Sequence, residues 1–163
     1  MNDEKLTRIV EAVTKQLSEA KGDEKVFGLK QAKKLIAAVE AKAKTMGLSV
    51  VVAVSNDAGR PIAIECMDNS YIASYDIALN KAYTVVALKM STKKLSPLAK
   101  PEGSLYGIQF TNNGQIVVFG GGDPLIYHGK IVGGLGVSGG SEEQDILLSE
   151  YGASILDDIM NEN

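Results

Sequence analysis

The sequence has very few of the residues on which many cross-links and catalytic or metal sites depend. Among its 163 residues there is one cysteine, Cys66, and one histidine, His128. A single cysteine excludes an intramolecular disulfide and indicates a reducing compartment such as the cytoplasm. A single histidine argues against nucleophilic triads and most zinc sites, which need a histidine beside Cys, Asp or Glu. We interpret His128 as a solvated turn residue and Cys66 as a small core or interface residue.

Long apolar runs and basic clusters are also missing. No apolar run approaches the ~20 residues of a membrane span, so we expect no membrane partner. The charged start MNDEKLTRIV precedes no apolar segment, so we expect no signal peptide. The net charge is -3 and no Lys/Arg cluster occurs, which argues against nucleic acid as a partner because phosphate binding needs a basic face. The length suits one domain with a short appendage.

The first residues form a separate unit of the chain. Apolar residues at helical spacing predict an amphipathic helix within residues 1–20, namely Leu6, Ile9, Val10, Val13 and Leu17. The following stretch is polar and contains a glycine, so we place a linker at residues 21–27. A globular α/β domain is expected over residues 28–163.

Within the domain we expect helices on both faces of an antiparallel sheet. A helix is predicted from Leu29 to Met46, followed by an apolar strand over residues 48–55 that is covered on both faces. A turn over residues 56–60 leads into the strand PIAIECM. The next helix is predicted over residues 71–90, with one apolar face made of Ile72, Tyr75, Leu79, Ala82 and Val86.

The last part of the chain is rich in strands. QIVVFGGG, residues 115–122, is predicted to be a strand that ends in three glycines. DPLIY and KIVGGLGVS are two further strands, joined by a two-residue turn at His128 and Gly129. A final helix is expected from Ser141, a good N-cap residue, onward. Glu142 and Asp145 share a face of this helix, where helix-dipole complementarity explains them more simply than a metal site.

Two glycine clusters and one helical pair are the candidate binding residues. Residues 134–139 spell GxGxxG, but we exclude a dinucleotide site because no second parallel strand follows the helix. The turn after it places backbone N–H groups at a helix start, where a carboxylate or phosphate can bind. Close helix–sheet packing explains the same glycines equally well. The residues of this turn are Gly139, Gly140 and Ser141.

The other candidates lie earlier in the chain. Gly120, Gly121 and Gly122 indicate close backbone approach to a ligand or a partner subunit, with a bulged connection as the alternative. Asn80 and Lys81 lie in the middle of a predicted helix, although Asn is a poor helix former. Solvent exposure is one explanation for this pair, and a polar group that faces a pocket is the other.

Several stretches together resemble the haem-degrading or haem-binding domain family, which includes the C-terminal domain of a propanediol-utilisation protein. They run in order across residues 29–145 and are Leu29–Met46, VVVAVSNDAGRPIAIECMD, IALNKAYTVVAL, LYGIQF, VVFGGGDPL and GKIVGGLGVSGGSEEQD. The resemblance implies a profilin-like three-layer α/β/α sandwich with a five-stranded antiparallel sheet. It also implies that the protein forms a homo-oligomer. Its function is then expected to involve haem, cobalamin or iron.

The chain departs from this family at two places. It has Cys66-Met67-Asp68 where the family often has Arg-Met-Asp, so a basic ligand contact is missing. Haem-binding relatives can use a histidine early in the domain, and residues 26–46 contain none. We therefore expect no axial ligation of haem by histidine. The sequence has no adenosyltransferase domain, so cobalamin adenosylation is not expected.

These observations favour a binding protein over an enzyme. The expected ligand is a small molecule or tetrapyrrole-like cofactor, with haem or cobalamin as candidates, bound near the two glycine clusters, Asn80 and Lys81. The alternatives are an enzyme or chaperone that handles haem or cobalamin, and a structural oligomeric scaffold. The pattern LxxIVxxVxxxL in residues 1–20 is similar to the encapsulation peptides of microcompartment cargo, which implies shell proteins as partners. Alternatively, this helix packs on its own domain or a sister subunit.

Overall fold

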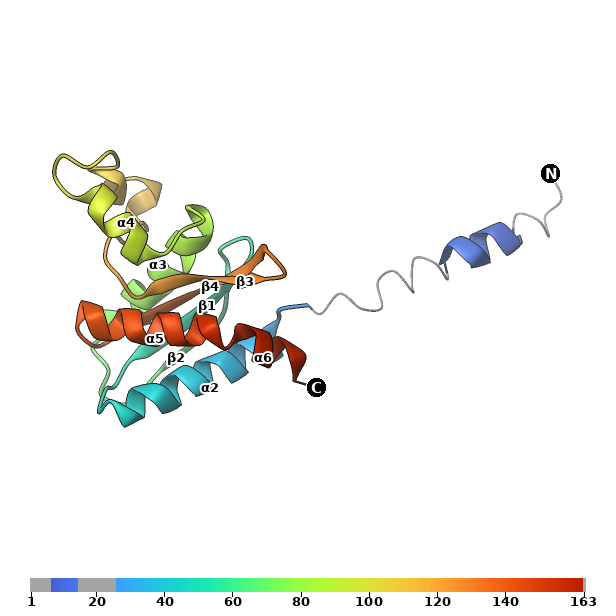
Figure 1. Cartoon of the computed structure of the whole chain (residues 1–163), viewed down its shortest axis with the longest axis horizontal. Coiled ribbons are helices and arrows are strands. Elements are labelled where there is room, and N and C mark those ends of the chain that lie inside the picture. The colour runs from blue at the N-terminus through green and yellow to red at the C-terminus, as the bar shows by residue number, and fades with distance from the viewer. Residues whose placement is uncertain (1–6, 15–25, 163) are drawn as a thin grey trace.

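A four-stranded antiparallel sheet in the order β2-β1-β4-β3 forms the middle layer of the domain (Figure 1). Its strands are β1 (Val51–Asn56), β2 (Pro61–Cys66), β3 (Gly122–Tyr127) and β4 (Lys130–Ser138). The computed structural model describes residues 7–14 and 26–162. In these ranges the sequence-based expectation of an α/β domain with an antiparallel sheet is confirmed.

Helices cover both faces of the sheet (Figure 1). One face carries α2 (Leu29–Thr45), α5 (Glu142–Ser154) and α6 (Leu156–Asn161), which contact one another. The other face carries α3 (Ser74–Ala87), and α4 (Thr92–Ala99) packs beside α3. The sheet is therefore the middle layer of three.

Strand β1 explains why the sequence has an uninterrupted apolar run here. Val52 and Val54 belong to the large core cluster that includes the side chains of α2, α5 and α6. Val51 and Ala53 pack instead with Ala78 and Ala82 of α3. Because successive strand side chains point to opposite faces, a strand between two helical layers needs apolar residues at every position. The prediction of a strand buried on both faces is confirmed.

Strand β4 lies directly against the backbone of α3, which accounts for the first glycines of the GxGxxG pattern. A Cβ atom at Gly136 would overlap the carbonyl oxygen of Ala78, and one at Gly134 would overlap the carbonyl oxygen of Ala82. Both glycines lie inside the strand, as expected.

The β3–β4 hairpin also turns where the sequence predicted, at His128 and Gly129, with φ of 48° and 76°. Positive φ at both central residues is the property of a type I′ turn.

The prediction of a fifth strand at residues 115–122 is wrong. Residues 116–121 form no strand, and the triple glycine leads into β3 instead of ending a strand. The N–H of Val117 donates to Oγ1 of Thr84 and the N–H of Gly120 donates to Oε1 of Glu142. Since helix side chains already bind these amide groups, the segment needs no neighbouring strand to satisfy them.

The predicted apolar face of α3 is wrong at Ile72 and Tyr75, whereas Ala82 is buried and Leu79 and Val86 are half-buried. Ile72 is 96% exposed and precedes the helix, and Tyr75 is 46% exposed. The buried face is shifted around the helix and consists of Ser74, Ala78, Lys81, Ala82, Thr84 and Val85. Small residues are needed there because the helix packs so closely on the glycines of β4.

Outside the domain, residues 7–14 are helical. Ile9, Val10 and Val13, at the predicted stripe, are 49%, 56% and 48% exposed. Leu6, Leu17 and the predicted linker at residues 15–25 lie outside the described residues. In the part of the chain that is described, no helix combines the length and the apolar character that a membrane span requires.

Candidate functional site

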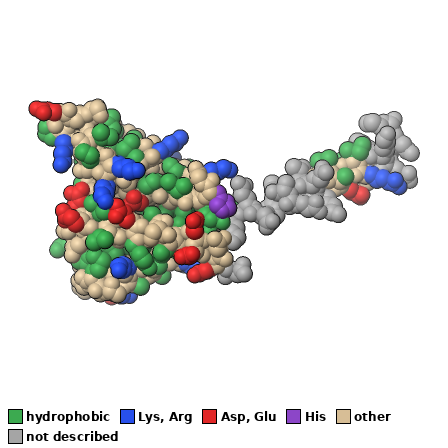
Figure 2. All heavy atoms as spheres, viewed as in Figure 1, with side chains coloured by type: hydrophobic (Ala, Val, Ile, Leu, Met, Phe, Trp, Pro, Cys, Tyr) green, Lys and Arg blue, Asp and Glu red, His purple; other side chains and the backbone are tan. Residues whose placement is uncertain are grey.

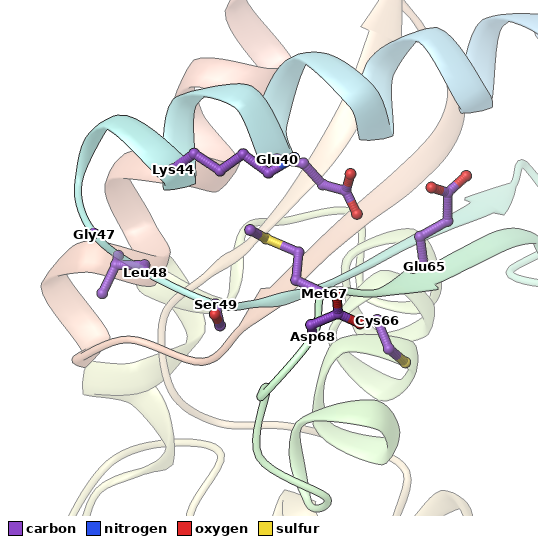
Figure 3. A pocket seen from close by; sticks show the side chains of 9 residues that line it. All are labelled: Glu40, Lys44, Gly47, Leu48, Ser49, Glu65, Cys66, Met67 and Asp68. Atoms are coloured by element: carbon purple, nitrogen blue, oxygen red, sulfur yellow. The ribbon is translucent and has the colours of Figure 1, made fainter.

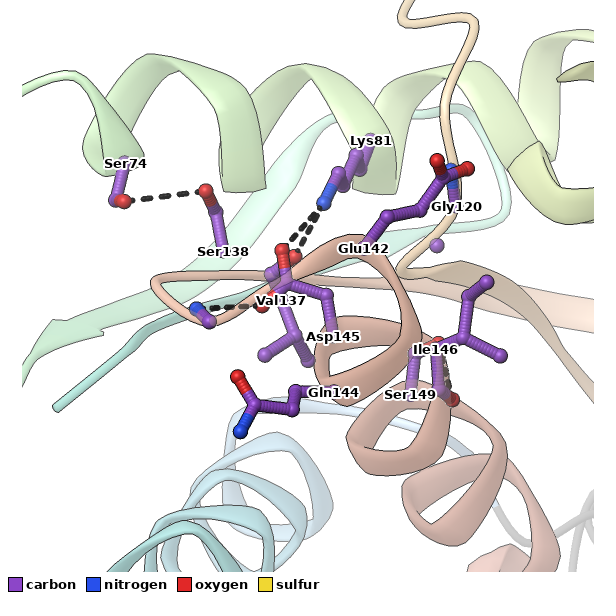
Figure 4. Close-up of polar contacts among 12 residues, drawn as sticks. Ser74, Lys81, Gly120, Val137, Ser138, Glu142, Gln144, Asp145, Ile146 and Ser149 are labelled. Carbon is purple, nitrogen blue, oxygen red and sulfur yellow. Dashed lines mark hydrogen bonds and ion pairs between the residues drawn. The ribbon is translucent and has the colours of Figure 1, made fainter. Parts of the chain in front are cut away.

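The most unusual feature of the domain is an ion pair buried between its layers (Figure 4). Lys81 of α3 and Asp145 of α5 place Nζ and Oδ2 2.9 Å apart, and their side chains are 0% and 5% exposed. Lys81 Nζ also donates to the carbonyl oxygen of Val137 in β4, at 2.7 Å. The pair therefore links α3, β4 and α5, which come from all three layers.

Burial disfavours the charged form of both members of the pair, and the attraction between them opposes this effect. Burial lowers the pKa of Lys81, and the nearby carboxylates of Asp145 and Glu142 only partly oppose this effect. Burial likewise raises the pKa of Asp145, against the opposing influence of Lys81 and the N–H of Gly140. Both changes reduce the cost of moving the proton from the amine to the carboxylate.

Asp145 also occupies the anion site that the sequence predicted at the start of α5. The N–H of Gly140 donates to Oδ1 of Asp145 at 2.9 Å, and the N–H of Ser141 donates to Oε1 of Gln144 at 2.8 Å. The expectation of free N–H groups is wrong at these two residues. The anion at this helix start is the carboxylate of the protein itself, and Ser141 acts as the N-cap of α5.

The triple glycine packs against the same ion pair. A Cβ atom at Gly121 would lie 2.6 Å from Nζ of Lys81 and 2.7 Å from Cβ of Asp145. The N–H of Gly122 donates to Oγ1 of Thr92 at 2.9 Å. The close backbone approach predicted for this cluster is therefore made, within the protein, to the Lys81 side chain.

A pocket of about 270 Å³ opens beside the pair, where α3, β4 and the start of α5 meet. Its apolar side is lined by Tyr71, Ala73, Ile77 and Phe119, and its polar side by Ser74, Ser138, Gly139, Gly140, Glu142 and Asp145. We call it the α3–α5 pocket. The sequence-based site contributed Gly139 and Gly140 to it, and Lys81 lies behind it, where the ring of Phe119 covers Nζ with its centroid 4.8 Å away.

Two buried hydroxyls line the inner wall of this pocket. Ser138 Oγ lies 3.1 Å from Ser74 Oγ, and the two residues are 5% and 3% exposed. The pair has two hydroxyl hydrogens and uses one in the bond between them. One hydrogen thus remains available for an acceptor atom in the pocket.

The remaining predicted residues are not part of the pocket lining. Asn80 is half-buried on α3, and its backbone carbonyl accepts a bond from Thr84 Oγ1. Ser141 is exposed, and the three glycines 120–122 are buried behind the pocket. Sequence reasoning missed Ser74, Phe119 and Ser138, and it assigned Asp145 to the helix dipole alone. The only signal for Asp145 was a lysine inside an apolar helix, which requires a counter-charge when it is buried.

A second, larger pocket lies at the end of α2 next to β2 (Figure 3). It measures about 560 Å³ and is lined by Glu40, Lys44, Gly47, Leu48, Ser49, Glu65, Cys66, Met67 and Asp68. Burial and then Glu65 raise the pKa of Glu40, with Lys44 acting in the opposite direction. Cys66, which departs from the family pattern, is thus at a cavity, together with Met67 and Asp68. Among the described residues no group of three or more His, Cys, Asp or Glu side chains is arranged to hold a metal ion.

The structure does not place His128 at either of the two candidate pockets. It is exposed in the β3–β4 turn, and its ring stacks on that of Tyr127 with the centroids 4.0 Å apart. Figure 2 shows acidic and basic side chains interspersed on the face drawn, with no continuous basic area.

The sequence and structural comparisons identify the family. Residues 27–154 match the family described as "Haem degrading protein HbpS-like". The chain belongs to this family. It is 47% identical over 122 residues to an uncharacterized 15.0 kDa protein from the dhaT-dhaS intergenic region of Citrobacter freundii, covering 75% of this chain and 86% of that one.

Other relatives extend the comparison. The chain is 39% identical over 114 residues to the corrinoid adenosyltransferase PduO of Salmonella typhimurium, covering 70% of this chain but 34% of PduO. The Klebsiella pneumoniae protein ORFY superposes with a TM-score of 0.78 at 39% identity, covering 80% of this chain and 90% of ORFY. A PduOC:heme complex superposes with a TM-score of 0.76 at 32% identity, covering 79% and 94% of the two chains. The chain thus spans about a third of PduO, and the family resemblance seen in the sequence is confirmed.

The packing of the glycine turn predicts that Gly140→Val destabilises the domain and impairs ligand binding. A Cβ atom at Gly140 would lie 2.8 Å from Cβ of Gln144, and moving the turn would break the bond from its N–H to Asp145. We expect a loss of unfolding free energy above the ~1 kcal/mol of an average substitution, measured by urea unfolding. Gly28→Val is the matched control, since its Cβ would have only Gln31 Oε1 nearby, at 3.9 Å. Unchanged unfolding in Gly140→Val would contradict this account of the packing of the turn.

Proposed function

We propose that this protein binds a flat, tetrapyrrole-like molecule at the α3–α5 pocket without catalysing a reaction on it. The observation that carries the proposal is the pocket itself, with buried serine hydroxyls inside and aromatic side chains at its opening. Membership of the HbpS-like family and the similarity to a protein solved with haem support a ligand of this class.

The rim of the pocket suits the apolar face of such a ligand. Tyr71 is 72% exposed and Phe119 39% exposed, and both line the pocket. Ile72 and Tyr75, which follow Tyr71 by one and four residues in the chain, are exposed as well. Large apolar side chains gathered at one place on a surface are typical of a binding site. They also support the prediction of a homo-oligomer, in which a second copy would cover part of this rim.

The size and charge of the pocket limit how a haem could bind. A volume of about 270 Å³ is below the roughly 300–1,000 Å³ of pockets that enclose drug-sized ligands. The pocket therefore takes one edge of a tetrapyrrole and leaves the rest on the exposed rings. Glu142 and Asp145 line the polar side, so the carboxylates of a haem would point to solvent. A haem ligated by histidine does not fit these residues, because His128 is in the β3–β4 turn.

The proposed role as microcompartment cargo depends on the N-terminal helix. In residues 7–14, Ile9, Val10 and Val13 expose an apolar stripe. Isolated helices of this length are marginal in water, so such a stripe is stabilised by an apolar groove on a partner. The similarity to PduO supports a cargo protein whose N-terminal helix binds shell proteins.

The first prediction of this proposal is that porphyrin binding does not depend on histidine. We expect metal-free protoporphyrin IX and hemin to bind with similar affinity, measured by porphyrin fluorescence and absorbance. His128→Ala should leave both unchanged, whereas Tyr71→Ala combined with Phe119→Ala should weaken both. A sharp Soret shift with hemin that His128→Ala abolishes would contradict the proposal, as would equal binding by the double variant.

The second prediction concerns the N-terminal helix. Deleting residues 1–20 should leave the melting temperature and the oligomeric state unchanged, because the packed domain begins at α2. The same deletion should abolish co-localisation with microcompartment shells, and residues 1–20 should target a fused fluorescent protein to them. Ile9→Glu with Val13→Glu should act like the deletion, whereas Arg8→Glu alone makes the same change in net charge outside the stripe and should not.

The opposite pattern would identify the helix as part of its own protein. In that case the truncation lowers the melting temperature or breaks the oligomer, and the fused peptide stays diffuse. The cargo hypothesis would then be wrong, while the porphyrin-binding hypothesis would be unaffected.

A further inference from the structure

The amine of Lys81 lies next to the α3–α5 pocket, because two of the residues it contacts, Phe119 and Asp145, line that pocket. The ring of Phe119 covers Nζ, with the centroid 4.8 Å away, and lines the pocket as well. Phe119 is 39% exposed and lies in the segment that forms no strand. Exposed side chains change rotamer within nanoseconds, so a different rotamer of this ring opens a path from the pocket to the amine.

The backbone packs closely around one side of the amine, so an adduct can form only on the side that the Phe119 ring covers. Gly121 approaches Lys81 with no side chain, and even one methyl group there would lie 2.6 Å from Nζ. The carboxylate of Asp145 lies 2.9 Å from Nζ and lines the pocket. An amine beside a carboxylate at the edge of an apolar cavity is the arrangement that imine formation requires.

We propose that Lys81 captures a small aldehyde or ketone from the α3–α5 pocket as an imine, with Asp145 carrying the proton. This goes beyond the tetrapyrrole proposal, because it concerns a covalent reaction of the protein with a different class of ligand. The reaction is a stoichiometric and reversible capture, so no turnover is required of it.

Each step of the capture balances within the site. Asp145 accepts a proton from the Lys81 ammonium, and the free amine attacks the carbonyl carbon. The C–N bond forms as the carbonyl π bond breaks, and the oxygen becomes the hydroxyl of a carbinolamine by taking the proton that the attacking nitrogen loses. Asp145 then returns its proton to this hydroxyl, which leaves as water when the C=N bond forms.

The pocket also selects the remainder of the ligand. Tyr71, Ile77 and Phe119 form an apolar wall, and the Ser74–Ser138 pair has one hydroxyl hydrogen to donate. Glu142 and Asp145 disfavour an anion. The favoured ligand is therefore an uncharged carbonyl compound with an apolar body and a hydrogen-bond acceptor at its far end. Benzaldehyde supplies the carbonyl and the apolar body and is a suitable probe.

The proposal is tested on the folded full chain by reductive trapping. Benzaldehyde and sodium cyanoborohydride convert the imine to a stable secondary amine, which peptide mass spectrometry assigns to a residue. At neutral pH we expect labelling of Lys81 to be several-fold faster than that of the exposed Lys44. Burial lowers the pKa of Lys81, with Asp145 and Glu142 facing it, so its labelling should reach half its maximal rate at a pH below the usual pKa of a lysine.

Two variants test whether the reaction takes place at this site. Phe119→Ala should speed the labelling of Lys81 by removing its cover, and Gly121→Ala should suppress it. Leu98→Ala is the matched control for Phe119, because it removes a similarly exposed apolar side chain from α4. An unlabelled Lys81 in folded protein, or its labelling only in urea, would overturn the proposal. Porphyrin binding is measured without aldehyde, so failure of either proposal is seen separately.

Discussion

A lysine and an aspartate that meet between the layers of the domain determine much of its architecture. Lys81 is the largest fully buried side chain among the described residues, and its ammonium has no access to solvent. A buried charge is tolerated only when it is paired and hydrogen-bonded. Asp145 and the carbonyl of Val137 provide that pairing, and the N–H of Gly140 binds the other carboxylate oxygen. The need for glycine at Gly121 follows from it, because a Cβ atom there would lie 2.6 Å from Nζ of Lys81 and 2.7 Å from Cβ of Asp145.

The sequence predicted the elements whose signals are local. The apolar run of β1, the turn at His128 and Gly129, and the N-cap at Ser141 each depend on neighbouring residues, and all were predicted correctly. The fifth strand was wrong because Thr84 and Glu142, distant in sequence, bind the amides of Val117 and Gly120. Only part of the candidate site could be predicted, because its residues are also distant from one another in the sequence. Lys81 could be singled out as an anomaly inside a helix, but its partner lies 64 residues further along the chain.

The same packing that hides the pair produces the pocket beside it. Because α3 packs so closely on β4, its start carries Ser74 to Ser138 and leaves Tyr71 at the surface. Polar groups thus lie inside and aromatic rings outside, which suits a ligand with one polar edge and a broad apolar face. The second pocket, with Glu40, Glu65 and Asp68, has no comparable apolar wall, and Cys66, one of the departures from the family pattern, lines it.

The direct test of this account is a double-mutant cycle on the buried pair, measured as unfolding free energy in urea. Lys81→Met and Asp145→Asn each leave one buried charge without its partner, and each should lose about 3–5 kcal/mol. The double variant should lose much less than the sum of the two single losses, since no unpaired charge remains. Strictly additive losses, or single variants as stable as the parent protein, would contradict the claim that this ion pair holds the layers of the domain together.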